Sequence, residues 1–327
     1  MAERDLIQQL DQAVEALLGR EAAAPTGPEV TDLLRIAADV RHLPDEDFRA
    51  NLRAQLISRA TKERKNMPTA TESWIREGFR TLTPYLHAPA SARLMEFMKE
   101  AFGAQEIFRA PRPDGTIMHA EVKIGDSILE MGEIPPDQWK GLLTPLHVYV
   151  PDVDAVYARA LAAGGTSLGE PRDHEYGERG ANVKDPGGNH WYLATAKGPH
   201  YIPEGLHNVN LALHPRGAPA FIDFLKKAFG AEEKERHESE GTVRHATVKI
   251  GDSILEMGEA HGPWQPMPCA IHMYVPDADE TYRRAVEAGA TSISAPVDQP
   301  YGERSGGVID PQGNYWYIAT TISKTAG

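Results

Sequence analysis

The first 75 residues carry apolar positions at helical spacing. Leu6, Leu10, Val14 and Leu17 recur every three or four residues, and two further stripes follow before a polar stretch at 61–73. Such spacing is typical of amphipathic helices with one face available for packing. We therefore expect a helical N-terminal segment plus linker over residues 1–75. It would serve as a packing or dimerisation appendage, or as a docking module for a protein partner.

From about residue 80 the pattern changes to short alternating runs separated by helical stretches, which predicts mixed strands and helices. The first set of predicted elements is a strand at 82–87, a helix at 90–102 and strands at 107–110, 117–124 and 127–131. The second set is a strand at 147–150, a helix at 153–163 and strands near 166–168, 181–184 and 190–195. Each set is a βαβββ unit, so we expect the α+β fold class.

The chain carries this order of elements twice. VKIGDSILEMGE occupies residues 122–133 and again 248–259, and DPGGNHWYLAT at 185–195 returns as DPQGNYWYIAT at 310–320. These matches in the same order indicate a tandem duplication of roughly 120 residues. The chain would then hold four βαβββ units, and paired polar residues would outline a site.

Each predicted strand has one aliphatic face and one polar face. On 117–124, Ala120, Val122 and Ile124 alternate with His119 and Glu121, which point the other way. We expect the aliphatic faces to pack under helices and the polar faces to curve around a cavity. The predicted ligand-binding residues are Tyr85, His87, His119, His147, Tyr149, His214, His245, His272, Tyr274, Arg179 and Arg304. The two arginines, from the repeated YGER motif, would either clamp a ligand anion or form salt bridges within the fold.

Composition excludes several classes of function. The formal net charge is −13 at pH 7, which argues against binding a nucleic-acid backbone. No apolar run approaches the roughly 20 residues that span a bilayer, and the charged N-terminus lacks the apolar core of a signal peptide. The single cysteine, Cys269, excludes an intrachain disulfide, so we expect a cytoplasmic protein without nucleic-acid or membrane partners.

At this point the chain resembles the vicinal oxygen chelate superfamily of glyoxalase I, bleomycin-resistance proteins and extradiol dioxygenases, and more closely its PhnB-like branch. The motifs that carry the resemblance are AFGA after the first helix, MHAEVKIGDS, HVYVPDVDAVYARALAAG, YGER and DPGGNHW. The resemblance implies two glyoxalase-like domains, at residues 80–198 and 204–323, that pair as an internal pseudo-dimer. A homodimer through the N-terminal helices is a further expectation.

The resemblance also implies where a metal would bind. Metal-dependent members carry ligands at positions that correspond here to Thr83 and Asn210, Glu130 and Glu256, Pro145 and Ala270, and Tyr192 and Tyr317. Only Glu130 and Glu256 keep a ligand-type side chain, so the familiar four-ligand glyoxalase site is absent. A rearranged site of Glu130 or Glu256 with cavity histidines would suit Zn, Fe, Ni or Mn.

Three functions fit these patterns. The leading hypothesis is a protein that sequesters or transforms a small, planar organic molecule held in His- and Tyr-lined clefts. The first alternative is a divalent-metal-dependent lyase, isomerase or dioxygenase in which Tyr192 and Tyr317 move protons. The second is a ligand-sensing interaction protein that acts through residues 1–75. The sequence leaves open whether the chain is an enzyme.

Overall fold

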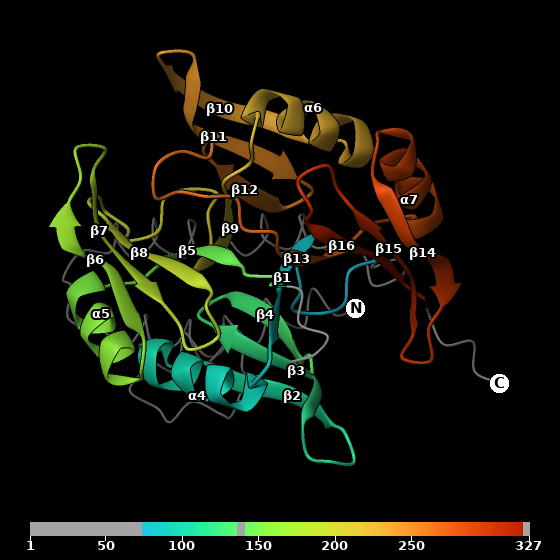
Figure 1. Ribbon diagram of the computed structural model, residues 1–327, viewed down its shortest axis with the longest axis horizontal. Helices are drawn as coiled ribbons and strands as arrows, with labels where there is room; N and C mark the ends of the chain where they lie inside the picture. The colour runs from blue at the N-terminus through green and yellow to red at the C-terminus, as the bar shows by residue number, and fades with distance from the viewer. Residues whose placement is uncertain (1–73, 136–140, 323–327) are drawn as a thin grey trace, which may run out of the picture. The chain divides into compact units, whose positions relative to one another are not determined.

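A computed structural model describes residues 74–135 and 141–322 of this chain (Figure 1). The chain divides into two compact units, Met1–Thr71 and Glu72–Gly327. The first unit, with the predicted N-terminal helices, lies outside the described residues. Within the described part, no helix is both long and apolar enough to cross a membrane.

The described part contains the four βαβββ units that the sequence predicts. The units of the first repeat are β1 (Leu82–Ala88), α4 (Ser91–Phe102), β2 (Gln105–Pro111), β3 (Ile117–Ile124) and β4 (Ser127–Glu133), then β5 (Pro145–Tyr149), α5 (Val153–Ala162), β6 (Thr166–Asp173), β7 (Glu178–Lys184) and β8 (His190–Ala196). Those of the second repeat are β9 (Val209–Leu213), α6 (Ala218–Phe229), β10 (Glu232–Ser239), β11 (Thr242–Ile250) and β12 (Ser253–Met257), then β13 (Ala270–Tyr274), α7 (Ala278–Glu287), β14 (Thr291–Asp298), β15 (Glu303–Ile309) and β16 (Tyr315–Thr321). The α+β prediction is confirmed.

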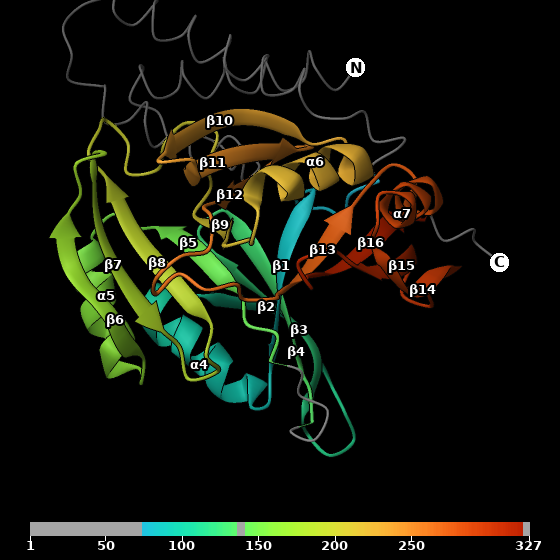
Figure 2. The ribbon, with the colours of Figure 1, turned by 45° about the horizontal axis from the view of Figure 1, so that its top comes forward.

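The strands form two eight-stranded sheets, and each sheet takes one unit from each repeat. The first sheet has the order β14-β15-β16-β13-β1-β4-β3-β2, and the second has β10-β11-β12-β9-β5-β8-β7-β6. Antiparallel pairs join the repeats, with Thr83 opposite His272 between β1 and β13, and His147 opposite Asn210 between β5 and β9. Blue β1 therefore lies beside orange β13 in Figures 1 and 2. Two tandem domains arranged in this way fit an internal pseudo-dimer.

The aliphatic strand faces pack against the helices, as the alternation predicts. Trp191 and Trp316 are fully buried core residues, in ring contact with Phe102 and Phe229 of the helices. The repeated DPxGN motif explains their position. Asp185 accepts hydrogen bonds from the backbone of its own turn and, at 2.8 Å, from the indole nitrogen of Trp191. The motif therefore anchors the core and does not form a phosphate cradle.

The Gly-Asp-Ser turns of the repeated VKIGDSILEMGE motif bind the opposite repeat. Ser127 accepts a hydrogen bond from the backbone of Val209 at 3.0 Å, where β9 begins. In return, Asp252 accepts one from the backbone of Thr81 at 2.8 Å, just before β1. Gly125 has a φ of +58°, and the side chain of Asn208 fills the space where a Cβ would lie. The identical turns thus hold the two repeats together reciprocally.

Candidate functional site

Polar side chains gather on one face of each sheet. Face A, on the first sheet, consists of Tyr85, His87, His119, Glu121, Glu130, His272, Tyr274, Glu303 and Tyr317. Face B, on the second sheet, consists of His147, Tyr149, Glu178, Tyr192, His214, His245 and Glu256. Because each sheet combines both repeats, every face draws side chains from both.

A histidine lies between two glutamates on each face. On face A, Nδ1 of His272 is 2.7 Å from a carboxylate oxygen of Glu130, and its Nε2 is 3.5 Å from Glu303. On face B, His147 has the same relation to Glu256 at 2.8 Å and to Glu178 at 3.8 Å. The two partners in each short contact come from different repeats, so each Glu-His-Glu triad bridges the duplication.

Tyr149 and Tyr274 support the triads and offer little surface of their own. The hydroxyl of Tyr149 donates to Glu178 at 2.7 Å, and that of Tyr274 donates to Glu303 at 2.5 Å. Both tyrosines are buried, with 2% and 0% of their surface exposed. We therefore infer that these tyrosines hold the second carboxylate of each triad in place. The sequence instead suggests that they contact the ligand directly.

The neighbouring carboxylates shift the pKa of the central histidine in each triad. Burial alone would lower the pKa of His147 and His272, because it disfavours the imidazolium. The charges of Glu256 and Glu130 outweigh burial and raise the pKa of each histidine above its ordinary value. Burial would likewise raise the pKa of Glu256, but His147 and His245 lower it to about 2. In the contact between His147 and Glu256, each group therefore favours the charged form of the other.

A neutral histidine pairs with a tyrosine hydroxyl on each face. Nε2 of His87 lies 3.2 Å from the Tyr317 hydroxyl, and Nε2 of His214 lies 3.1 Å from the Tyr192 hydroxyl. Burial lowers the pKa of both histidines to about 4, so they are uncharged at pH 7. Their Nδ1 atoms have no hydrogen-bond partner among the described residues. Tyr192 and Tyr317 thus each share a hydrogen bond with a neutral histidine.

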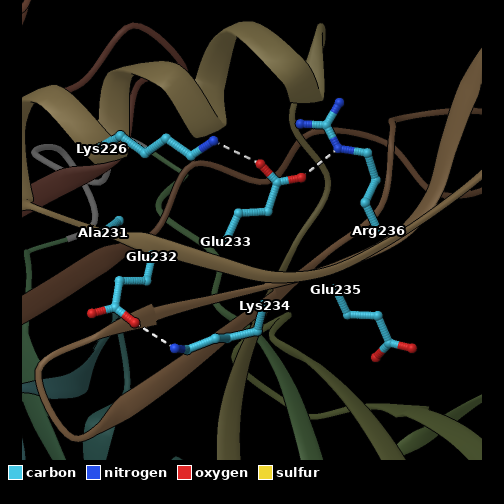
Figure 3. Close-up of a pocket in the computed structure, with 7 residues that line it drawn as sticks. All are labelled: Lys226, Ala231, Glu232, Glu233, Lys234, Glu235 and Arg236. Atoms are coloured by element: carbon cyan, nitrogen blue, oxygen red, sulfur yellow. Dashed lines mark hydrogen bonds and ion pairs between the residues drawn. The ribbon is translucent and has the colours of Figure 1, made fainter.

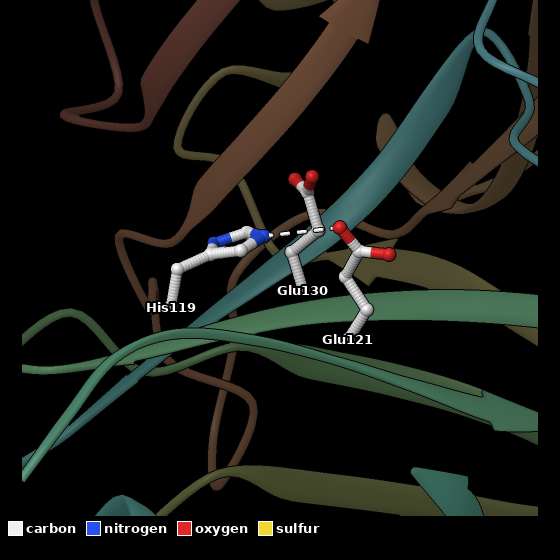
Figure 4. A group of neighbouring side chains, drawn as sticks. All are labelled: His119, Glu121 and Glu130. Atoms are coloured by element: carbon white, nitrogen blue, oxygen red, sulfur yellow. Dashed lines mark hydrogen bonds and ion pairs between the residues drawn. The ribbon is translucent and has the colours of Figure 1, made fainter. Parts of the chain in front are cut away.

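Face A also holds a group with possible metal-ligand geometry. One ligand atom each from His119, Glu121 and Glu130 lie within 4.8 Å of one another (Figure 4). Each group already has a protein partner: His119 is 3.2 Å from Glu121, Arg76 pairs with Glu121, and His272 pairs with Glu130. The duplication gives no signal for Glu121, because its counterpart in the second repeat is Thr247.

The positions that the family resemblance assigns to metal ligands do not fit a metal in this structure. Pro145 and Ala270 supply no donor side chain, and Tyr192 and Tyr317 bond to histidines. Glu130 and Glu256 are paired with histidines across the repeats. The four-ligand glyoxalase arrangement is therefore not formed by these residues.

Arg179 and Arg304 do not reach the polar faces. Arg179 pairs with Asp154 at 2.6 Å and with Asp173 at 3.3 Å, and Arg304 pairs with the matching residues Asp279 and Asp298. The preceding residues Glu178 and Glu303 point instead toward the triads, as strand alternation requires. Of the two roles that the sequence suggests, the arginines have the salt-bridging one, and we leave them out of the proposed site.

Two surface depressions lie away from the triads. The larger is lined by Lys226, Ala231, Glu232, Glu233, Lys234, Glu235 and Arg236 (Figure 3). Lys226 and Arg236 both pair with Glu233, so these exposed charges neutralise one another. The smaller lies beside His214 and Pro266 and has a volume of about 10 Å³, room for about one water molecule. We assign no function to the larger depression, whereas the smaller one lies beside His214 of face B.

Comparison with known proteins defines the family. The sequence matches the Glyoxalase/Bleomycin resistance protein/Dioxygenase superfamily over residues 88–193 and 211–318, and the chain belongs to that superfamily. The uncharacterized protein Rv0887c of Mycobacterium tuberculosis is 35% identical over 122 residues, which cover 34% of this chain and 72% of that protein. CFP32 of Mycobacterium bovis, named only provisionally as a glyoxylase, is 27% identical over 215 residues. The match covers 62% of this chain and 80% of the CFP32 chain.

A solved structure supports the same fold. Glyoxalase I from Zea mays superimposes with a TM-score of 0.58 at 17% identity, and the match covers 73% of this chain and 92% of the maize chain. At this identity the similarity concerns the fold alone. The predicted superfamily is confirmed, whereas the assignment to its PhnB-like branch stays a prediction.

Proposed function

We propose that this chain binds a small organic molecule on the polar faces of its sheets, either sequestering or transforming it. The observation that carries the proposal is the buried Glu-His-Glu triad, built twice beside a partly buried His-Tyr pair. Buried ion pairs contribute little net stability, because desolvation offsets the attraction between the charges. Groups of this kind concentrate where a ligand binds or a proton moves. Membership of the superfamily supports the same reading.

The residues have distinct roles in this proposal. The hydroxyl of Tyr192 or Tyr317 would form a hydrogen bond with a polar atom of the ligand, because each of these tyrosines is only half-buried on its face. The imidazolium of His147 or His272 would stabilise negative charge that develops on a ligand oxygen. Proton transfer between such a histidine and the ligand, coupled to the shift of a ligand bond, would make the protein an isomerase, and coupled to the cleavage of a ligand bond would make it a lyase. Binding without a reaction would make it a sequestering protein.

Thermal unfolding of the full chain against planar organic compounds and antibiotics tests the proposal. A ligand at a hundred times its Kd stabilises the folded state by about 2.7 kcal/mol, which raises Tm by several degrees. We expect this shift in the wild type and in Arg179→Gln, whose side chain lies off the faces. We expect its loss in a variant with both His147→Gln and His272→Gln. If no compound in a broad panel raises Tm, the proposal is wrong.

Metal-dependent chemistry is the second candidate, and the grouping of His119, Glu121 and Glu130 favours it. A divalent ion held there would act as a Lewis acid toward substrate oxygens. Elemental analysis of protein purified without chelators tests it. We expect about one equivalent of metal in the wild type and in Glu256→Gln, and a loss of metal in Glu121→Gln. A content below about a tenth of an equivalent, with no rebinding, excludes it.

A further inference from the structure

The two faces share the triad but differ at the positions beside it. Tyr85 of β1 corresponds to Ala212 of β9, and each lies two residues before the matching histidine, His87 or His214. On face A, the Tyr85 hydroxyl is 3.0 Å from Nδ1 of His119, and its ring stacks on His87 with centroids 4.7 Å apart. On face B the side chain of Ala212 ends at Cβ, so β9 supplies no ring and no hydroxyl here.

Two equivalent glycines show where this difference leaves space. A Cβ added to Gly132 on face A would meet the Tyr85 hydroxyl at 3.1 Å. A Cβ added to Gly258 on face B would meet only backbone atoms of Val243 and Arg244 within 4.0 Å, so no described side chain covers that position. No side chain therefore takes the place of the Tyr85 hydroxyl beside Gly258 on face B.

A second difference closes face A further. On face A, Arg76 pairs with Glu121. On face B the matching position is Thr247, which cannot form such an ion pair. The exposed fractions of the matching histidines agree with this. The side chain of His119 is 25% exposed on face A, whereas that of His245 is 44% exposed on face B. Face B is thus the more accessible of the two.

Face B also presents an aromatic surface. The ring of Trp264 lies 5.3 Å from that of Tyr192 and 5.5 Å from that of His214, between centroids. Trp264 comes from the segment after β12 and is only partly buried. Flat rings of this kind bind planar molecules by stacking and edge contacts. The neutral His214 and the hydroxyl of Tyr192 add hydrogen-bonding groups beside them.

The charges on face B select against anions. Glu178 and Glu256 contribute two carboxylates, and even with both His147 and His245 protonated the charges only balance. In the described part of the chain, no lysine or arginine pairs with either glutamate. A cationic ligand would gain from the carboxylates and from the faces of the aromatic rings, and an anion would gain from neither.

We propose that face B is the ligand site and that its ligand is a planar aromatic molecule, neutral or positively charged, whereas the chain's own side chains fill face A. This inference rests on the proposed function, since it names which face binds and what it binds. It predicts one binding site per chain, although the fold is duplicated.

Isothermal titration of the full chain at pH 7.5 with three naphthalenes tests this proposal. The probes are 2-naphthalenemethanol, 2-naphthylmethylamine and 2-naphthoate, which share one ring system and differ in charge. We expect the alcohol and the ammonium to bind at one equivalent per chain. We expect the carboxylate to bind at least roughly tenfold more weakly, because Glu178 and Glu256 repel it and already hold the His147 imidazole between them.

Variants then locate the site. Ala212→Tyr adds to face B the ring that face A has and should abolish binding, whereas Glu287→Tyr, on the exposed surface of α7, should leave it unchanged. Trp264→Ala should weaken binding roughly three- to tenfold. If Ala212→Tyr does not fold, the result for Trp264→Ala decides. Circular dichroism checks the fold of each variant.

The outcomes separate this inference from the proposed function. Two equivalents per chain, or unchanged binding by both Ala212→Tyr and Trp264→Ala, overturn the assignment to face B. Tighter binding of the carboxylate, or no binding of any naphthalene while other compounds raise Tm, overturns the ligand class. A chain that no compound stabilises overturns the proposed function itself.

Discussion

Replacing Glu256 with glutamine measures how strongly the buried triad depends on its charges. The substitution keeps the size of the side chain and leaves the imidazolium of His147 with only Glu178, 3.8 Å away. The pKa of Glu256 falls from 4.5 to about 2 in the folded chain. Since one pKa unit corresponds to about 1.4 kcal/mol, His147 and His245 together favour the charged carboxylate by a net amount on the order of 3 kcal/mol after the cost of burial. Breaking buried pairs in general costs about 3–5 kcal/mol.

Urea unfolding at pH 6 measures the effect, and the chain supplies a matched control. Arg179 contacts Asp154 at 2.6 Å, but the pair is exposed, with 36% and 53% of the side-chain surfaces accessible. We expect Arg179→Gln to lower the free energy of unfolding by less than about 1 kcal/mol. If Glu256→Gln is as mild as this control, the triad is not the buried ion pair that we describe.

The pH dependence gives a second check on the same pair. The folded pKa of Glu256 is depressed, so its contribution is present above 4.5 and is lost as the pH falls toward 2. The folded pKa of His147 is raised, so its contribution is complete below 6.5 and is lost as the pH rises through the folded value. The stability difference between the wild type and Glu256→Gln should therefore be largest between pH 4.5 and 6.5. A difference that grows steadily into the alkaline range would contradict this.

Three further substitutions test other parts of the structure. Folding lowers the pKa of His87 from 6.5 to about 4. Between these two pH values the unfolded chain binds a proton that the folded chain does not, so the free energy of unfolding drops as the pH falls. In urea titrations across this range, His87→Phe should show a smaller drop than the wild type. Asp185→Ala removes the acceptor for the indole of Trp191 and should cost about 1–3 kcal/mol, measured by denaturation followed by tryptophan fluorescence; wild-type stability would refute the anchoring role. Gly125→Ala should lower Tm more than Gly115→Ala, because both have positive φ but only Gly125 faces a side chain of the other repeat; equal losses would count against the reciprocal contact.

Strand alternation predicts the fold well because it depends on local geometry. Successive side chains of a strand point to opposite faces, so His119 and Ala120 separate without any knowledge of tertiary contacts. Turn glycines and helix stripes then give the order of each unit. The pairing of β1 with β13 is not local, because such similar repeats carry no signal that says which copy supplies the neighbouring strand. The contact between Glu130 and His272 could therefore not be predicted from spacing.

The candidate site was harder to predict for two reasons. Glu178 and Glu303 lie within the YGER motif, which reads as a loop, although β7 and β15 begin at these glutamates and turn them toward the triads. Alternation within the motif was the available signal, since it also turns Arg179 away. Arg76 precedes the first strand and belongs to no periodic segment, so nothing in the sequence connects it with Glu121.

The reciprocal Gly-Asp-Ser contacts also bear on how such a chain assembles. A single repeat would carry half of each sheet, and both halves would end at an open strand edge that invites pairing. In the folded chain, each repeat pairs with the open strand edges of the other. Two chains can satisfy the same edges by swapping repeats, which would give a dimer with four complete sheets and the same local contacts. The short connection near residue 200 thus decides between closure within one chain and an interlocked dimer.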